Sequence, residues 1–297
     1  MYSLIEMLRY KRPQGSDTQL EFCERFLEPH FGLPDNHGNY ILQIGEAPSI
    51  CFTSHHDTVH RTEGLQQLVV TSNVVSVTDP AISSCLGADC TTGVWLMLGM
   101  IEQRIEGVYV VHAAEELGCM GSAALVKDNP YWLTGIDAVI SFDRYGDTSV
   151  ITHQMGRRTA SAEFATSFAD ALDLPQLIAD PNGSYTDSNE YANVVSECTN
   201  ISVGYYGQHG VNETQDLEFA DLLMYKLCAA DWSKLVIARD PSLYESQYED
   251  EKWWCSRLYG DVASQDQCDD YDRESIISLI EDNTCAVADM LINLGMT

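Results

Sequence analysis

The chain has 297 residues, 45% of them apolar, and its 45 acidic and 16 basic residues give a formal net charge of −29. This length and apolar content allow one large α/β domain with an extension, or two modest domains. The excess of acid argues against nucleic acid and against an anionic membrane as partners, because phosphate groups are bound by Lys and Arg. It indicates a solvated acidic surface, with some attraction for cationic substrates or divalent cations.

The first part of the chain predicts two helices and then two strands. Helical patterns cover residues 2–10 and 17–28, and Ser16 is expected to cap the second helix. After a turn, apolar runs at 40–44 and 49–53 predict two adjacent strands.

From residue 68 onward, strands and helices alternate. Strands are expected at 68–71 and 74–78, which form a hairpin, and at 107–112, 138–142 and 200–205. Helices are expected at 91–103, 120–127, 160–172 and 217–236. The alternation predicts an α/β fold, a three-layer α/β/α sandwich with a mostly parallel mixed sheet, followed by a C-terminal extension.

The composition changes near residue 240, where Asp240-Pro241 ends the last of these helices. Residues 241–271 are rich in Asp, Glu, Tyr and Trp, and a final amphipathic helix follows. We therefore expect a main domain at 1–240 and an extension at 241–297 that packs on it.

The ten cysteines lie singly along the chain without a C-x-x-C pair. This spacing favours buried free thiols in a reducing compartment over a disulfide framework. No secretory signal and no apolar run of about 20 residues is visible. We therefore expect the protein to be a cytoplasmic enzyme.

Five short motifs carry imidazole and carboxylate groups, which zinc and cobalt bind well. Most of them follow an expected strand, and ligands of open α/β sheets bind at the carboxyl ends of the strands. The residues are His55 with Asp57, Asp89, Glu115 with Glu116, Asp143, and His209 with Glu213 behind it.

Each motif also has a structural interpretation. His55 would bind metal through one ring nitrogen while Asp57 accepts a hydrogen bond from the other. Without the later motifs, however, a surface histidine is the favoured interpretation of His55. Asp89 lies among small residues that permit close approach of the backbone, and one carboxylate can bridge two ions. The alternative for Asp89 is a cap of the following helix.

Glu115 and Glu116 form a pair of like charges at a strand end, which is unfavourable unless a cation compensates it. The alternative is an exposed acidic turn. Asp143, at the tip of a buried strand, needs a partner, which is either a metal or Arg144. His209 lies between a glutamine and a glycine in an expected loop, although histidines of this kind are often core residues.

Taken together, these motifs resemble those of the co-catalytic zinc exopeptidases, the clan of bacterial leucyl aminopeptidases, glutamate-type zinc carboxypeptidases and aminoacylases. The resemblance extends over about residues 1–238. It is carried by a D-x-x-G-N turn at 35–40, H-x-D-x-V at 54–59, the bridging-aspartate loop at 87–93, E-E-x-G-x-x-G-S at 114–122, the strand-end aspartate at 141–144 and H-x-x-x-E at 209–213.

The resemblance implies two zinc ions, for which cobalt or manganese can substitute. One ion would be bound by His55, Asp143 and one oxygen of Asp89. The other would be bound by Glu116, His209 and the second oxygen of Asp89.

It also implies roles for other residues. Glu115 would be the general base that takes a proton from the attacking water, and Asp57 would orient a ligand. Tyr205 or Tyr206 would help to stabilise the oxyanion. Asp187 lies in a segment that resembles a loop on the substrate side of the family's site, although this match is weaker than those of the metal ligands. The peptide bond after Asp89 is often cis in this clan.

Two features depart from the family pattern. Cys90 replaces the Asp or Asn often found after the bridging aspartate. The stretch from Asp143 to His209 is too short for the lid domain that many relatives carry between these ligands.

The resemblance thus implies a metal-dependent hydrolase of peptide or amide bonds acting on a peptide or an N-acyl amino acid. Basic residues near the motifs are few (Arg144, Arg157 and Arg158) and acidic ones many, which favours an aminopeptidase, since its substrate carries an ammonium group. A carboxypeptidase, an N-acyl amino acid deacylase and a non-catalytic metal-binding or interaction module are the alternatives.

Overall fold

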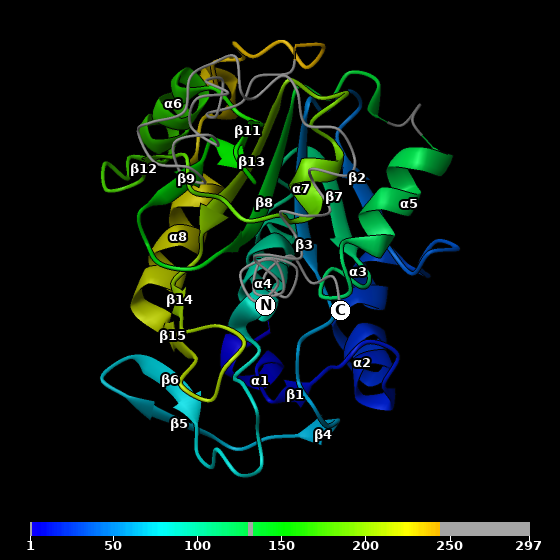
Figure 1. The fold of residues 1–297 in the computed structure, drawn as a ribbon, viewed down its shortest axis with the longest axis vertical. Coiled ribbons are helices and arrows are strands. Elements are labelled where there is room, and N and C mark those ends of the chain that lie inside the picture. The colour runs from blue at the N-terminus through cyan, green and yellow to red at the C-terminus, as the bar shows by residue number, and fades with distance from the viewer. Residues whose placement is uncertain (1, 130–132, 244–297) are drawn as a thin grey trace, which may run out of the picture. The chain divides into compact units, whose positions relative to one another are not determined.

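The computed structural model describes residues 2–129 and 133–243 (Figure 1). The extension expected at 241–297 lies outside the described residues from residue 244 onward. The central sheet has seven strands in the order β12-β9-β13-β8-β3-β7-β2. Their bounds are β2 Tyr40–Ile44, β3 Ile50–His55, β7 Gly107–His112, β8 Ala138–Arg144, β9 Ser149–Ile151, β12 Ile178–Asp180 and β13 Glu197–Ser202.

The sheet is mixed and mostly parallel, as predicted. The pairs β12–β9, β13–β8, β8–β3 and β3–β7 are parallel, whereas β9–β13 and β7–β2 are antiparallel. The expectation that β2 and β3 are neighbours is wrong, because β7 lies between them. Every residue of β7 is buried, so it needs a neighbour on each side, whereas the partly exposed β2 suits the edge.

Helices cover both faces of this sheet (Figure 1). On one face lie α4 (Ala88–Glu102), α6 (Ala162–Leu172) and α8 (Leu217–Ala229), and on the other α5 (Met120–Asp128) and α7 (Asp187–Glu190). Side chains that alternate along the strands supply two apolar cores. Phe52, Tyr109 and Ile140 belong to the first, and Cys51, Val108, Val110 and Val139 to the second. The three-layer sandwich is therefore confirmed.

The N-terminal helix is shorter than expected. It covers Leu4–Met7 (α1) instead of 2–10, and the chain continues as strand β1 (Tyr10–Lys11), which pairs with β4 (Gly64–Leu65). A pairing partner so far along the sequence leaves no trace in the local pattern, which is why a helix was expected.

The helical region expected at 17–28 begins as α2 (Asp17–Phe22). The Ser16 hydroxyl accepts a backbone N–H of its first turn at 3.1 Å, so the predicted cap is present. The helical path then continues through a π-helical turn, Cys23–Leu27, into α3 (Glu28–Phe31).

The C-terminal end of α8 also differs from the expectation. The helix ends at Ala229 instead of 236, and a 3₁₀ turn follows at Trp232–Lys234. The Asp231 carboxylate accepts the N–H of Ser233 and so begins this separate turn.

A second sheet has four strands in the order β14-β15-β6-β5. Their bounds are β5 Leu68–Thr71, β6 Val74–Val77, β14 Tyr205–Tyr206 and β15 Thr214–Asp216. The predicted hairpin is confirmed, whereas the strand expected at 200–205 is divided between the two sheets. A small hairpin pairs β10 (His153–Gln154) with β11 (Arg157–Arg158). The loop between β14 and β15 carries His209 and Glu213.

No helix in the described ranges is long and apolar enough to cross a membrane. The described cysteines are free, and all but the last are buried: Cys23, Cys51, Cys85, Cys90, Cys119, Cys198 and Cys228. The expectation of buried free thiols is confirmed for these residues except Cys228, which is half-buried.

Candidate active site

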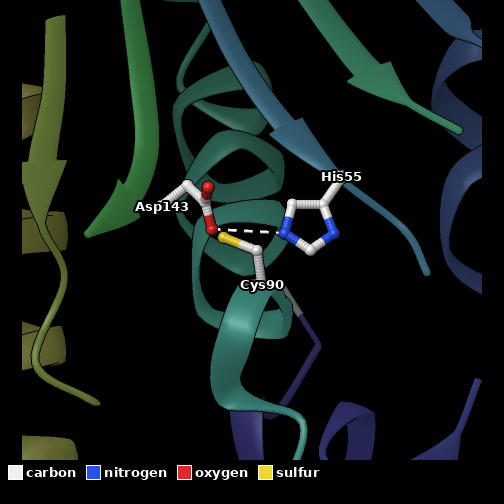
Figure 2. Close-up of side chains that lie close together, drawn as sticks. All are labelled: His55, Cys90 and Asp143. Carbon is white, nitrogen blue, oxygen red and sulfur yellow. Dashed lines mark hydrogen bonds and ion pairs between the residues drawn. The ribbon is translucent and has the colours of Figure 1, made fainter. Parts of the chain in front are cut away.

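The predicted ligands converge where the central strands end. His55 is the last residue of β3, and Asp143 lies near the end of β8, which extends further than expected. Figure 2 shows these two side chains pointing toward each other, with the Cys90 sulfur beside them at the start of α4. Asp89 has a non-helical ψ of 103°, and its bond to Cys90 is cis, as the resemblance implies.

A single carboxylate connects the two histidines of the site. Asp89 Oδ1 lies 3.2 Å from His55 Nε2, and Asp89 Oδ2 lies 3.1 Å from His209 Nε2. His55 Nε2 is also 3.2 Å from Asp143 Oδ1, and His209 Nε2 is 3.2 Å from Glu116 Oε2. The structure thus brings all five predicted metal ligands together in two groups that share Asp89.

The buried Asp57 fixes the orientation of His55. His55 Nδ1 lies 3.1 Å from the Asp57 carbonyl oxygen and 3.4 Å from its carboxylate. Because both are acceptors, Nδ1 donates its proton to Asp57, and Nε2 is turned toward Asp89 and Asp143. The Asp57 carboxylate also accepts the backbone N–H groups of Glu115 at 3.2 Å and Glu116 at 3.1 Å. One side chain therefore positions two of the motifs.

Asp143 is held by groups that leave one of its oxygens for a metal. Thr186 donates its hydroxyl to Asp143 Oδ2 at 2.7 Å, so Oδ1 is the oxygen that faces His55. Asn200 and Tyr205 donate to the Asp143 carbonyl oxygen. The alternative ion pair with Arg144 does not form: Arg144 pairs with Asp180 at 3.4 Å.

The pKa values of the site reflect carboxylates crowded together out of water. Burial raises the pKa of Glu115 well above its ordinary range, and the charges of Asp143, Asp187 and Glu116 add to this. Burial raises the pKa of Glu116 to about 7 against the opposing bond from His209. For Asp89 burial acts in the same direction, but the bonds from His209 and His55 prevail and lower its pKa.

These groups fit divalent cations. Within the described residues, no Lys or Arg pairs with the carboxylates of the cluster, and the buried Glu116 Oε1 has no hydrogen-bond partner. Ligand atoms of His55, Asp89 and Glu116 lie within 4.8 Å of one another, as do those of His55, Cys90 and Asp143. Such spacings suit nitrogen and oxygen ligands about 2.0–2.2 Å from a zinc ion.

We expect the metal-free protein to become less stable as the pH rises above about 6.5, because below that value the lowered pKa values of the buried His56, His60 and His112 act in the opposite direction. Glu116 and Glu213 both have a pKa raised to about 7, above the ordinary 4.5, because they are buried. The folded chain then binds their protons more tightly than the unfolded chain, so their contribution to stability decreases as pH rises through that interval. His209, whose pKa is raised to about 11 by its bonds to Asp89 and Glu116, continues the trend above 6.5.

The melting temperature in excess chelator, measured between about pH 6.5 and pH 8, checks this prediction. Added zinc should raise it most at the higher pH, since cations compensate the carboxylates. A melting temperature that rises with pH in chelator would contradict the prediction.

Glu213 has a part in the site that the sequence did not reveal. Its carboxylate is 1% exposed and accepts four backbone N–H groups from the loop that leads into α4. Oε2 accepts those of Leu86 and Gly87 at 2.8 and 2.9 Å, and Oε1 accepts those of Ala88 and Asp89 at 2.8 and 3.1 Å. The H-x-x-x-E spacing of His209 and Glu213 is the sequence feature that could have indicated this role. Glu213 thereby holds the backbone of Asp89 in place.

Arg12 is a second residue that the sequence did not single out. It is fully buried, with its guanidinium 4.0 Å from the Phe22 ring centroid. It donates to the His56 carbonyl oxygen at 2.9 Å and to the Thr91 hydroxyl at 2.8 Å. It therefore ties the His55–Asp57 loop to the first turn of α4. An arginine just after a short strand carries no local signal of this.

The three expected substrate residues lie in different surroundings. Tyr205 is buried, and its hydroxyl donates to Asp143 O at 3.0 Å. Asp187 is 1% exposed and accepts the Ser122 hydroxyl at 2.6 Å, and its Oδ2 has no partner among the described residues. Tyr206 is 40% exposed.

A cavity of about 90 Å³ opens beside the ligands. Tyr205 lines it, whereas Tyr206 and Asp187 do not. The residues around it are Asp89, Glu115, Asp143, Arg144, Tyr145, Ser184, Tyr185, Tyr205, Gln208 and His209.

Several solved structures with the same fold are described as peptidases. Aminopeptidase PepT from Bacillus cereus shares 15% identity with a TM-score of 0.57, covering 76% of this chain and 95% of that one. A tripeptidase from Staphylococcus aureus shares 14% with a TM-score of 0.59, covering 76% and 95%. The TET1 peptidase of Pyrococcus horikoshii shares 16% with a TM-score of 0.56, covering 76% and 98%. Among curated proteins, none matches the sequence.

The match to a peptidase family, together with the fold, shows a metallopeptidase of the co-catalytic zinc exopeptidase clan. The model of peptidase family M28 matches residues 39–188, about half of the chain. The protein belongs to peptidase family M28.

Proposed function

We propose that the protein is an aminopeptidase that works with two zinc ions and with Glu115 as general base. The observation that carries this proposal is the position of Asp89. Its two oxygens face two different histidines at 3.2 and 3.1 Å, each histidine having a further carboxylate beside it. A carboxylate in this position suits a bridge between two ions about 3.5–4 Å apart.

His55, Asp143 and Asp89 Oδ1 would hold one ion, and Glu116, His209 and Asp89 Oδ2 the other. When bound, the ions supply Lewis acidity, which polarises the scissile carbonyl and lowers the pKa of water.

Glu115 is placed to transfer the proton. Its Oε2 lies 4.0 Å from His55 Nε2, and it lines the cavity beside Asp89 and Asp143. Burial raises the pKa of Glu115, and this direction supports a role in accepting a proton. Glu115 would take a proton from the attacking water and deliver it to the leaving amine. His209, exposed on its loop, borders the opening through which a substrate enters.

The excess of acidic over basic residues in the chain favours an aminopeptidase, because acidic groups attract the ammonium group of a peptide. Carboxypeptidase or deacylase action at the same site, and metal binding without catalysis, are the competing functions.

Hydrolysis of the tripeptide Leu-Gly-Gly by the zinc-loaded full chain tests the proposal. We expect leucine and Gly-Gly as the first products. First products Leu-Gly and glycine would instead show a carboxypeptidase, and preferential release of acetate from N-acetyl-leucine a deacylase. Stoichiometric zinc binding without turnover of any of these substrates would show a metal-binding module.

We also propose that the enzyme is cytoplasmic and that residues 241–297 pack on the main domain. The free thiols of the described cysteines support a reducing compartment. Limited proteolysis that removes 241–297 without changing the melting temperature would contradict the packing.

A further inference from the structure

Arg144 occupies an unusual position in this acidic site. It follows Asp143 directly at the end of β8 and lines the same cavity as Glu115 and His209. Of the described residues that line the cavity, it is the only lysine or arginine. It is 6% exposed, and a charged side chain is rarely so deeply buried unless it is paired.

Contacts to three residues fix the Arg144 guanidinium. Its Nη2 donates to the Asn182 carbonyl oxygen at 3.0 Å and lies 3.4 Å from Asp180 Oδ2. Its Cζ lies 4.1 Å from the Tyr145 ring centroid, a cation–π distance. The group is therefore oriented before any ligand arrives, which lowers the entropy lost on binding.

The same guanidinium retains unused donors. All of its hydrogen bonds to other described residues come from Nη2. Nε is buried and is therefore closed to a ligand, whereas Nη1 makes no hydrogen bond to the described part of the chain and is not buried. Asp180 meanwhile accepts the Ser149 hydroxyl and the Asn182 N–H, so it is shared among several donors. Arg144 can therefore still bind an anion, and guanidinium binds carboxylates best.

We infer that Arg144 binds the free C-terminal carboxylate of the substrate, so that the enzyme acts on short peptides. This inference rests on the proposed peptidase function and names its substrate class. Arg144 lines the same small cavity as the predicted metal ligands Asp89 and Asp143, and successive peptide residues span only about 3.3–3.6 Å each. A carboxylate bound by Arg144 is therefore one or two residues beyond the scissile bond. Dipeptides and tripeptides meet this condition.

The small size of the cavity agrees with this substrate class. Its volume of about 90 Å³ leaves room for a small group beside the ligands. Tyr145 and Tyr185, 42% and 45% exposed, stand at its border. In such a short substrate the carboxylate reaches Arg144 while the amino end lies on the side of Asp89, Glu115 and Asp143. Both ends of the peptide are then recognised.

Comparison of free peptides with their C-terminal amides tests this inference. The zinc-loaded full chain should hydrolyse Ala-Ala and Ala-Ala-Ala with a kcat/KM at least about tenfold higher than that for Ala-Ala-NH₂ and Ala-Ala-Ala-NH₂, since one charge-assisted hydrogen bond is worth that much. The difference should lie mainly in KM, because the carboxylate is bound equally in the ground and transition states. A hexapeptide should be a poorer substrate than the tripeptide.

Three variants separate binding from structure. Arg144→Gln should reduce the preference for the free acid to near unity while hydrolysis of the amides persists. Arg144→Lys keeps the charge and should retain part of the preference. Arg104→Gln removes an exposed arginine just beyond the opposite end of α4 and should leave the preference unchanged.

The outcomes distinguish the inference from the function on which it rests. Equal hydrolysis of acids and amides by the unaltered enzyme overturns the role of Arg144 and leaves the peptidase intact. A preference that survives in Arg144→Gln overturns it as well. If no peptide is hydrolysed by the zinc-loaded enzyme, the proposed function itself fails.

Discussion

Replacement of Glu115 by glutamine is expected to reduce kcat by about 10²–10⁴-fold while the zinc content stays unchanged. Glutamine has nearly the shape of glutamate but cannot accept a proton from water or return it to the leaving amine. The ligand groups of His55, Asp89 and Asp143 are untouched by this change. The backbone N–H of residue 115, which donates to Asp57 at 3.2 Å, also remains.

Three measurements check the prediction: kcat on Leu-Gly-Gly, zinc per chain by elemental analysis, and the melting temperature. Glu21→Gln is the matched control, because Glu21 is exposed on α2 and the same change there should alter none of them. A Glu115→Gln enzyme with full activity would remove Glu115 from the mechanism. Loss of zinc in that variant would make Glu115 a ligand instead.

Replacement of Glu213 by glutamine is expected to destabilise the protein by about 3 kcal/mol and to weaken metal binding by about 10–100-fold. The carboxylate accepts four backbone N–H groups, the last of them from Asp89. A glutamine amide presents two donors of its own to two of these N–H groups, which then lose their acceptor in a buried site. The loop that places Asp89 would shift, and both metal groups share that residue.

Urea unfolding in excess chelator measures the first effect without contribution from metal. Zinc competition against a chromophoric chelator measures the second. Glu21→Gln serves again as the control. A Glu213→Gln variant with unchanged zinc affinity would show that these four bonds support the fold but not the metal ligands.

Much of the fold was predictable because its elements carry local patterns. The bounds of β2 and β7 agree with the runs seen in the sequence, and the start of α2 agrees with its serine cap. Hydrophobic periodicity and capping residues act within a few positions, so one stretch of sequence shows them. The order of the strands could not be predicted in the same way, because β7 comes from a distant part of the chain and lies between β2 and β3.

For the site, the sequence by itself determined the chemical groups: the imidazoles and carboxylates of His55, Asp89, Glu116, Asp143 and His209, in an order typical of a known clan. Only the tertiary structure decided how they are held. Asp57 orients both His55 and the Glu115–Glu116 turn, and Glu213 binds the loop of Asp89 from 124 to 127 residues away. Hydrogen bonds of that sequence separation depend on the packing of whole elements, which no local pattern of residues encodes.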